Sequence, residues 1–126
     1  MTIGPEESAM SDERFLAQLW AVIESRKADE TATESYTRKL LANPPKIRRK
    51  IAEEAYEVNE AHQALLDGKD SQDHLAHEAA DLVYHLFVLL ASADVTPSAV
   101  YSVLERRHAV QGHAPIPSGP GAGKTP

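Results

Sequence analysis

The chain has 126 residues, a length that favours one domain with a modest core. Its formal net charge of −6 argues against nonspecific binding to nucleic acid or to an anionic membrane. There is no Cys, which excludes a disulfide framework and a thiolate metal site. No apolar run approaches the ~20 residues of a membrane span, and residues 1–7 lack the pattern of a signal peptide. A cytoplasmic enzyme or binding protein is therefore expected.

The first predicted element is a helix that begins after Ser11 or Asp12, either of which can cap it, and ends near Ala28. Its apolar stripe consists of Phe15, Leu16, Leu19, Trp20 and Ile23. The polar residues 1–11 before it are predicted to form a flexible arm.

A short helix is predicted next, capped by Ser35 and ended by Asn43-Pro44-Pro45. A long helix then runs from about residue 45 to residue 66, and Gly68 closes it. Apolar and small residues recur along it at steps of four and three, which predicts a packing seam. The seam consists of Ile47, Ile51, Ala55, Val58, His62 and Leu65.

Another long helix opens at Ser71, and Thr96-Pro97 starts a last one that ends near His108. The helix after Ser71 is apolar almost all round, so we expect it to be the most buried. Its seam consists of Leu75, Ala79, Leu82, Leu86 and Leu89. The Gly/Pro-rich residues 111–126 are predicted to be a disordered tail. The sequence thus predicts an all-α domain over 12–110, with about five helices in an antiparallel bundle completed by homodimerisation.

Two acidic clusters interrupt the two longest predicted helices: Glu53-Glu54-Ala55-Tyr56-Glu57 and Glu78-Ala79-Ala80-Asp81. Residues three apart project from the same side of a helix, so each cluster holds one pair of neighbouring carboxylates. Both pairs flank the apolar seams, where carboxylates need a cation to neutralise them. Hard oxygen ligands suit Mg²⁺, with Mn²⁺ as a possible substitute. From spacing alone, the alternative remains that these carboxylates are solvated surface positions and not a metal site.

Glu53-Glu54-x-x-Glu57, followed after twenty residues by Glu78-x-x-Asp81, resembles the signature of the all-α nucleoside triphosphate pyrophosphohydrolases, the MazG-like superfamily. Further elements narrow the resemblance to the phosphoribosyl-ATP pyrophosphatase family. They are Ser35-Tyr36-Thr37, the lysines Lys46 and Lys50, the segment from Glu78 to Leu86, and Arg106-Arg107-His108. The resemblance covers about residues 13–108. Ala52 and Pro44-Pro45 depart from it, since many relatives carry Gly there.

The resemblance implies cytoplasmic, Mg²⁺-dependent dimers that hydrolyse phosphoribosyl-ATP to phosphoribosyl-AMP and pyrophosphate, the second step of histidine biosynthesis. It implies that Glu54, Glu57, Glu78 and Asp81 are metal ligands. Glu53 would be a ligand to a further ion, or a base that orients the attacking water. The family also occurs fused to the enzyme of the next step, and this chain resembles the stand-alone form.

Six other residues are candidates for binding the substrate, and most also have a structural explanation. Lys50 can pair with Glu54 four residues later, Ser35 can be only a helix cap, and the two arginines suit a helix C-terminus. The candidates are Lys46, Lys50, Ser35, Tyr36, Arg106 and Arg107.

Three further side chains have open roles. His85 is expected beside Asp81 on the helix surface, where it would orient a carboxylate, although a partly buried, hydrogen-bonded His is the more common outcome. Tyr84 and His62 are expected to pack.

Two other functions remain open from the sequence. One is a related pyrophosphohydrolase that acts on free (deoxy)nucleoside triphosphates. The other is a helical dimerisation module without enzymatic activity, in which the acidic clusters are solvated.

Overall fold

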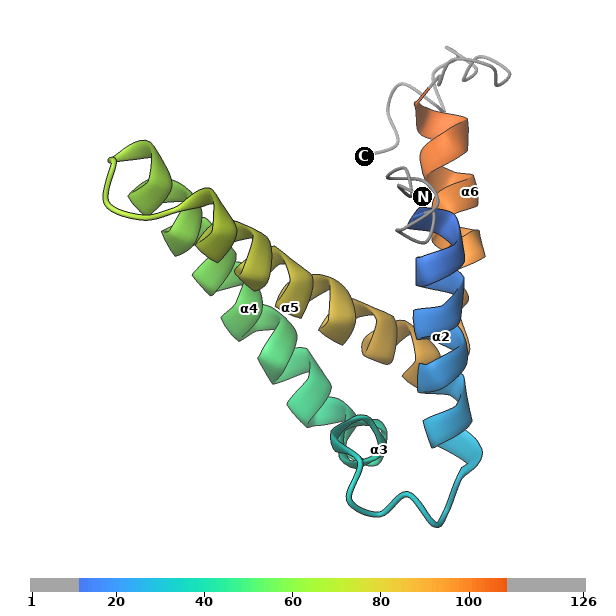
Figure 1. The fold of residues 1–126 in the computed structure, drawn as a ribbon. Coiled ribbons are helices and arrows are strands. Elements are labelled where there is room, and N and C mark those ends of the chain that lie inside the picture. The colour runs from blue at the N-terminus through green and yellow to red at the C-terminus, as the bar shows by residue number, and fades with distance from the viewer. Residues whose placement is uncertain (1–11, 109–126) are drawn as a thin grey trace, which may run out of the picture. The chain divides into compact units, whose positions relative to one another are not determined.

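The computed structural model describes residues 12–108, and every regular element in that range is an α-helix (Figure 1). The chain divides into two compact units, Met1–Ala93 and Asp94–Pro126. The predicted all-α class with about five helices is confirmed. The predicted arm 1–11 and tail 111–126 lie outside the described residues, and the single domain 12–110 stays a prediction.

The first unit holds four described helices: α2 (Asp12–Ala28), α3 (Tyr36–Leu41), α4 (Pro44–Leu66) and α5 (Gln72–Ser92). Three of them begin at polar side chains that accept a hydrogen bond from a backbone N–H of the first turn. Ser35 accepts from Arg38 N at 3.2 Å, and Ser71 accepts from His74 N at 3.1 Å. Asn43 caps α4 in the same way. The predicted caps Ser35 and Ser71 are confirmed.

α4 and α5 form a hairpin: they lie side by side and run in opposite directions (Figure 1). The turn between them depends on Gly68, which has a φ of +73°. Gly68 N donates to Leu65 O at 3.0 Å, and Lys69 N donates to Ala64 O at 2.8 Å, so the last carbonyls of α4 are satisfied. This short turn fixes how the acidic clusters of the two helices face each other.

The core lies where α2 and α3 pack against the hairpin, at the end away from Gly68. The rings of Trp20 and Phe87 meet edge to face, with their centroids 6.1 Å apart. All four helices contribute buried side chains, namely Ile23, Leu40, Ile47, Phe87, Val88 and Ala91.

Two basic side chains connect helix ends within this unit. Lys27 Nζ donates to the carbonyl of Ala91 at 2.8 Å, near the end of α5. Arg38 Nη1 donates to the carbonyls of Arg26 and Lys27 at 3.2 and 2.8 Å, at the end of α2. These contacts satisfy carbonyls that the helices leave without an internal partner.

The predicted seams are correct only in part. On α4 the buried residues are Ile47, Glu54 and Ala61, spaced by seven, and His62 is exposed, so its predicted packing role is wrong. On α5, Leu86 is 40% exposed although it was placed in the seam. The buried line of α4 runs through Glu54, and exposed His62 lies off that line. α5 does hold the most buried residues of the described helices, as predicted.

By length and composition alone, α5 is the one described helix that meets the criteria for a membrane span. The core helix of a soluble protein meets the same criteria. α5 carries Glu78 and Asp81, and its C-terminal half packs into the core through Phe87 and Val88. We therefore interpret it as the core helix of the first unit.

The second unit is described by one helix, α6 (Pro97–Arg107). Thr96 caps it by accepting from Ala99 N at 3.2 Å, and Pro97 occupies the first turn, where its missing N–H has no cost. His108 N donates to Leu104 O at the other end. The predicted start and end of this helix are confirmed.

Candidate active site

Three carboxylates meet across the hairpin. Glu54 on α4 and Glu78 and Asp81 on α5 each offer an oxygen atom, and these atoms all lie within 4.8 Å of one another. Glu54 is buried, Glu78 is partly buried and Asp81 is exposed, so the group extends from the helix contact to the surface. Since α4 and α5 run antiparallel, residues on their facing sides that are distant in sequence come together here.

Glu54 shows the electrostatic strain of this arrangement. Burial, a hydrogen bond with Glu57 and the charge of Asp81 together raise the pKa of Glu54 from 4.5 to about 7. Lys50 acts in the opposite direction but does not cancel these effects. A group of carboxylates in which one is driven to bind a proton is suited to bind a cation in its place.

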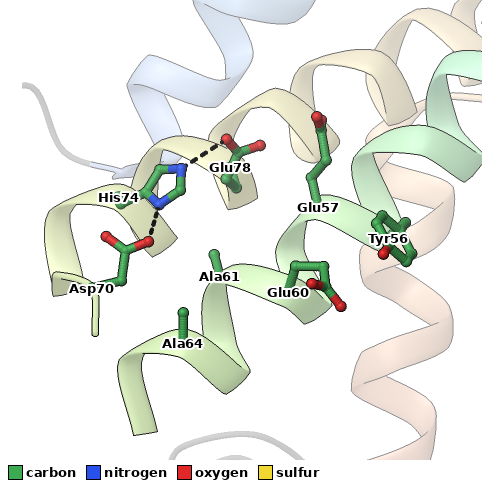
Figure 2. Close-up of a pocket in the computed structure, with 8 residues that line it drawn as sticks. All are labelled: Tyr56, Glu57, Glu60, Ala61, Ala64, Asp70, His74 and Glu78. Atoms are coloured by element: carbon green, nitrogen blue, oxygen red, sulfur yellow. Dashed lines mark hydrogen bonds and ion pairs between the residues drawn. The ribbon is translucent and has the colours of Figure 1, made fainter. Parts of the chain in front are cut away.

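The donor set fits a hard divalent ion. Mg²⁺ binds oxygen ligands at about 2.1 Å in an octahedron, so oxygen atoms on one ion lie at most about 4.2 Å apart. The three oxygen atoms lie within 4.8 Å of one another, so they would have to move closer together to share one ion. Glu57 is outside this group, yet it interacts with Glu54, and Figure 2 shows it pointing from α4 toward the side where Glu78 lies. Its predicted role as a ligand stays a prediction.

Glu53 faces a different environment from Glu54. Its half-exposed side chain lies 3.5 Å from Lys50 Nζ and 3.9 Å from Arg49 Nε. It also lines a groove of about 420 Å³ with Ala52, Tyr56 and Glu57. Glu53 therefore borders the carboxylate group from outside, among cations.

Lys50 connects these two environments. Its Nζ lies 3.9 Å from Glu54 Oε1, so the ion pair expected from their spacing of four is present. Although partial burial acts to lower it, the pKa of Lys50 is raised, because Tyr36, Glu53 and Glu54 favour the charged form. Lys50 is thus a charged group beside the carboxylates.

His85 is buried at 5% exposure and hydrogen-bonded, so the more common of its two predicted environments is confirmed and the place on the helix surface is wrong. Its Nδ1–H donates to the carbonyl of Asp81 at 2.8 Å, which leaves Nε2 to accept from the hydroxyl of Tyr36 at 3.0 Å. Nδ1 also lies 3.6 Å from Glu54 Oε1. His85 therefore fills the space behind the carboxylate group and contacts its buried member.

Tyr36 and Tyr84 form an aromatic pair next to His85. Their rings are stacked with centroids 6.3 Å apart, and Lys46 Nζ lies 5.9 Å from the centroid of Tyr36. Tyr84 also shares a hydrogen bond with the hydroxyl of Thr37. Tyr84 packs against the core as predicted, whereas Tyr36 is 45% exposed.

The remaining candidates for substrate binding are not brought to this group by the described contacts. Ser35 uses its hydroxyl as the cap of α3. Arg106 and Arg107 lie in the last turn of α6, in the second unit. Their contact with a substrate stays a prediction.

A link between Asp70, His74 and Glu78 was not predicted. His74 Nδ1 lies 2.5 Å from Asp70 Oδ2, and His74 Nε2 lies 3.1 Å from Glu78 Oε1 (Figure 2). The hydrogen bond to Asp70 is the main cause that raises the pKa of His74. The repeated spacing of four residues, 70 to 74 to 78, is the sequence feature from which it could have been predicted. A second groove of about 380 Å³ is bordered by all three residues.

Comparison with known proteins gives a consistent result. A family model described as phosphoribosyl-ATP pyrophosphohydrolase matches residues 16–108. A phosphoribosyl-ATP pyrophosphatase of Nitrosomonas eutropha is 39% identical over 104 residues, which cover 81% of this chain and 83% of the relative. One from Cereibacter sphaeroides is 43% identical over 101 residues, or 79% of this chain and 91% of the relative. The histidine biosynthesis bifunctional protein HisIE of Yersinia pestis is 42% identical over 101 residues, covering 79% of this chain and 47% of that protein.

Proposed function

We propose that this chain, which belongs to the phosphoribosyl-ATP pyrophosphohydrolase family, hydrolyses phosphoribosyl-ATP to phosphoribosyl-AMP and pyrophosphate. This reaction is the second step of histidine biosynthesis, and we expect it to take place in the cytoplasm. The observation that carries the proposal is the convergence of Glu54, Glu78 and Asp81 from two antiparallel helices. These carboxylates lie beside Lys50, so a group able to hold a cation would stand next to a positive charge, as a polyphosphate substrate requires.

Glu54, Glu78 and Asp81 would hold Mg²⁺, with Glu57 as a fourth ligand and Mn²⁺ as a substitute ion. When bound, the ion supplies charge neutralisation at phosphate oxygens and lowers the pKa of bound water. Burial of Glu54 against His85 limits the freedom of that carboxylate, so this member of the group would be organised before a ligand arrives.

The chain's own cations would bind the phosphates. Lys50 is charged and lies on the face of α4 that carries Glu54, and Lys46 is one turn earlier, over the ring of Tyr36. The exposed side of that ring is available to border a base. Phosphoryl transfer depends mainly on such positioning and on electrostatic stabilisation.

Glu53 is the candidate base. It is half exposed, next to Lys50 and at the edge of a groove, so it can accept a proton from an incoming water molecule. The water oxygen forms a new bond to phosphorus, the phosphoanhydride bond breaks, and pyrophosphate leaves. Ion pairs to Lys50 and Arg49 keep Glu53 oriented between turnovers.

A second copy of the chain would cover the outer face of α5. Val83 and Leu86 lie three residues apart on one side of that helix and are 41% and 40% exposed. Leu90, four residues further along the same side, is partly buried. Apolar side chains in a row on a small domain are typical of a homodimer interface.

A substrate panel tests the assignment. Purified protein with Mg²⁺ should release pyrophosphate from phosphoribosyl-ATP at a kcat/KM far above that for ATP, dCTP or dUTP. A preference for a free triphosphate would reassign the chain to the related nucleotide pyrophosphohydrolases. Release from no substrate at any Mg²⁺ concentration would favour the dimerisation module.

Thermal melting tests the metal site separately from the reaction. Millimolar Mg²⁺ should raise the melting temperature of the wild-type protein, because an ion that binds the folded state stabilises it. The shift should disappear in the Glu54→Gln/Asp81→Asn double variant and persist in Glu60→Gln, which removes an exposed carboxylate on α4. Equal shifts in all three proteins would contradict the proposed site.

A further inference from the structure

The imidazole of His74 lies between two carboxylates of different kinds. One is Asp70, just before α5, and the other is Glu78, a member of the group proposed to bind the metal. Figure 2 shows the ring spanning the gap, with Asp70 at Nδ1 and Glu78 at Nε2. The contact with Asp70 at Nδ1 orients the ring so that Nε2 faces Glu78.

We propose that His74 is a positioning residue, oriented by Asp70, that holds the carboxylate of Glu78 in place to bind the catalytic cation. This inference rests on the proposed metal site. It adds two residues, Asp70 and His74, that would orient a metal ligand without binding the metal themselves.

The three members of the carboxylate group are held by different means. Glu54 is buried and lies near both His85 and Lys50. Glu78 sits closer to the surface, with a side chain that is 19% exposed. Within residues 12–108, the described hydrogen bond that holds its carboxylate comes from His74. Without it, the flexible side chain of Glu78 would have to be ordered by the metal itself, at a cost in conformational entropy.

The arrangement leaves Glu78 free to act as a ligand. His74 occupies Oε1, and a carboxylate has a second oxygen atom with lone pairs of its own. A ligating carboxylate that is also hydrogen-bonded by an outer partner is a common feature of metal sites, and loss of such a partner costs about 10- to 100-fold in metal affinity.

His77 provides a matched control on the same helix. It is the residue next to Glu78, but its Nδ1–H donates to the carbonyl of Asp73 at 2.8 Å. Its side chain is 73% exposed. The two histidines thus differ in whether they bond to the carboxylate group.

The test compares Mg²⁺ dissociation constants obtained by following the melting temperature across a Mg²⁺ titration. His74→Ala should weaken Mg²⁺ binding about tenfold or more. His74→Gln should restore most of the affinity, because an amide N–H four residues before a carboxylate can donate to it. Asp70→Ala should weaken binding in the same direction, while His77→Ala should bind as the wild type does. Circular dichroism without Mg²⁺ checks that each variant is helical.

Several results would overturn the inference. One is a His74→Ala protein that binds Mg²⁺ as tightly as the wild type, and another is a His74→Gln protein no better than His74→Ala. If His77→Ala weakens Mg²⁺ binding as much as His74→Ala does, then losing either histidine charge is enough to weaken binding. The bond from His74 to Glu78 would then not be the cause. If the wild-type protein itself binds no Mg²⁺, the proposed metal site fails and this inference fails with it.

Discussion

Glu54 brings together burial, hydrogen bonding and charge in one side chain. It lies on the buried line of α4 and faces Asp81, Glu57 and the ring of His85. The spacing of three residues predicted an acidic pair on each helix, and one carboxylate of the first pair meets both of the second. It did not predict that Glu54 would be in the buried line itself, because a position's burial depends on how the partner helix is rotated.

The raised pKa of Glu54 predicts a pH dependence of stability in metal-free protein. The folded-state pKa, about 7, is above the ordinary value of 4.5, so folding favours the protonated form. Its contribution is fully present below about pH 4.5 and is lost as the pH rises through about 7. Compared with Glu54→Gln in EDTA, the wild-type melting temperature should therefore fall between pH 4.5 and 7.5. A difference between the two proteins that stays constant with pH would contradict this account.

The contribution of the hydrogen bond between Tyr36 and His85 to stability can be measured by itself. Tyr36→Phe keeps the ring but leaves Nε2 of a buried imidazole without its donor. We expect the free energy of unfolding to fall by about 1–3 kcal/mol in urea denaturation. Tyr56→Phe, at a position 64% exposed, should change it by less than about 0.5 kcal/mol. Equal effects of the two substitutions would argue against the bond.

At the scale of elements, helix ends were easier to predict than helix faces. Ser35, Ser71, Thr96-Pro97 and Gly68 act through their own neighbouring backbone, so the sequence alone was sufficient. The faces depend on distant partners. His62 and Leu86 fit a helical periodicity but are exposed, because the contact between α4 and α5 follows a different line.

Capping by Ser35 gives a prediction for α3. Ser35→Ala should destabilise the protein by about 1 kcal/mol, because the Arg38 N–H loses its acceptor. Ser35→Asn should be close to the wild type in chemical denaturation, since Asn is an equally good cap. If Ser35→Asn is as unstable as Ser35→Ala, the hydroxyl has a role in the fold other than capping.

At the scale of the whole molecule, the proposed second copy of the chain would cover the exposed apolar residues of α5. Leu86→Glu would place a charge in that interface, so we expect sedimentation velocity to show a shift from dimer to monomer. Asn59→Glu, which adds the same charge at an exposed position of α4, should leave the dimer intact. A wild-type protein that is monomeric at micromolar concentration would contradict the interface.

Only those parts of the candidate site whose residues lie close together in the sequence could be predicted from it. Spacing predicted the acidic pairs on two helices, whereas the roles of Glu54, Glu57, Glu78 and Asp81 as metal ligands followed from the family resemblance and stay a prediction. The link from Asp70 through His74 to Glu78 was present as a repeat of four, but its role depends on α4 bringing Glu54 opposite. Helix periodicity could not predict where Arg106 and Arg107 lie relative to these carboxylates, because it describes each helix by itself.

The most direct test is the rate of pyrophosphate release from phosphoribosyl-ATP at saturating Mg²⁺ by wild-type protein, Asp81→Asn and Glu60→Gln. Asp81 is an exposed member of the carboxylate group, so its replacement should leave the fold intact. We predict that Asp81→Asn lowers kcat/KM by at least about 100-fold. Even the loss of a residue that only hydrogen-bonds to a metal ligand lowers metal affinity or activity by about 10- to 100-fold. Glu60→Gln should remain near the wild-type rate. Wild-type activity in Asp81→Asn would contradict the assignment of this carboxylate group as the active site.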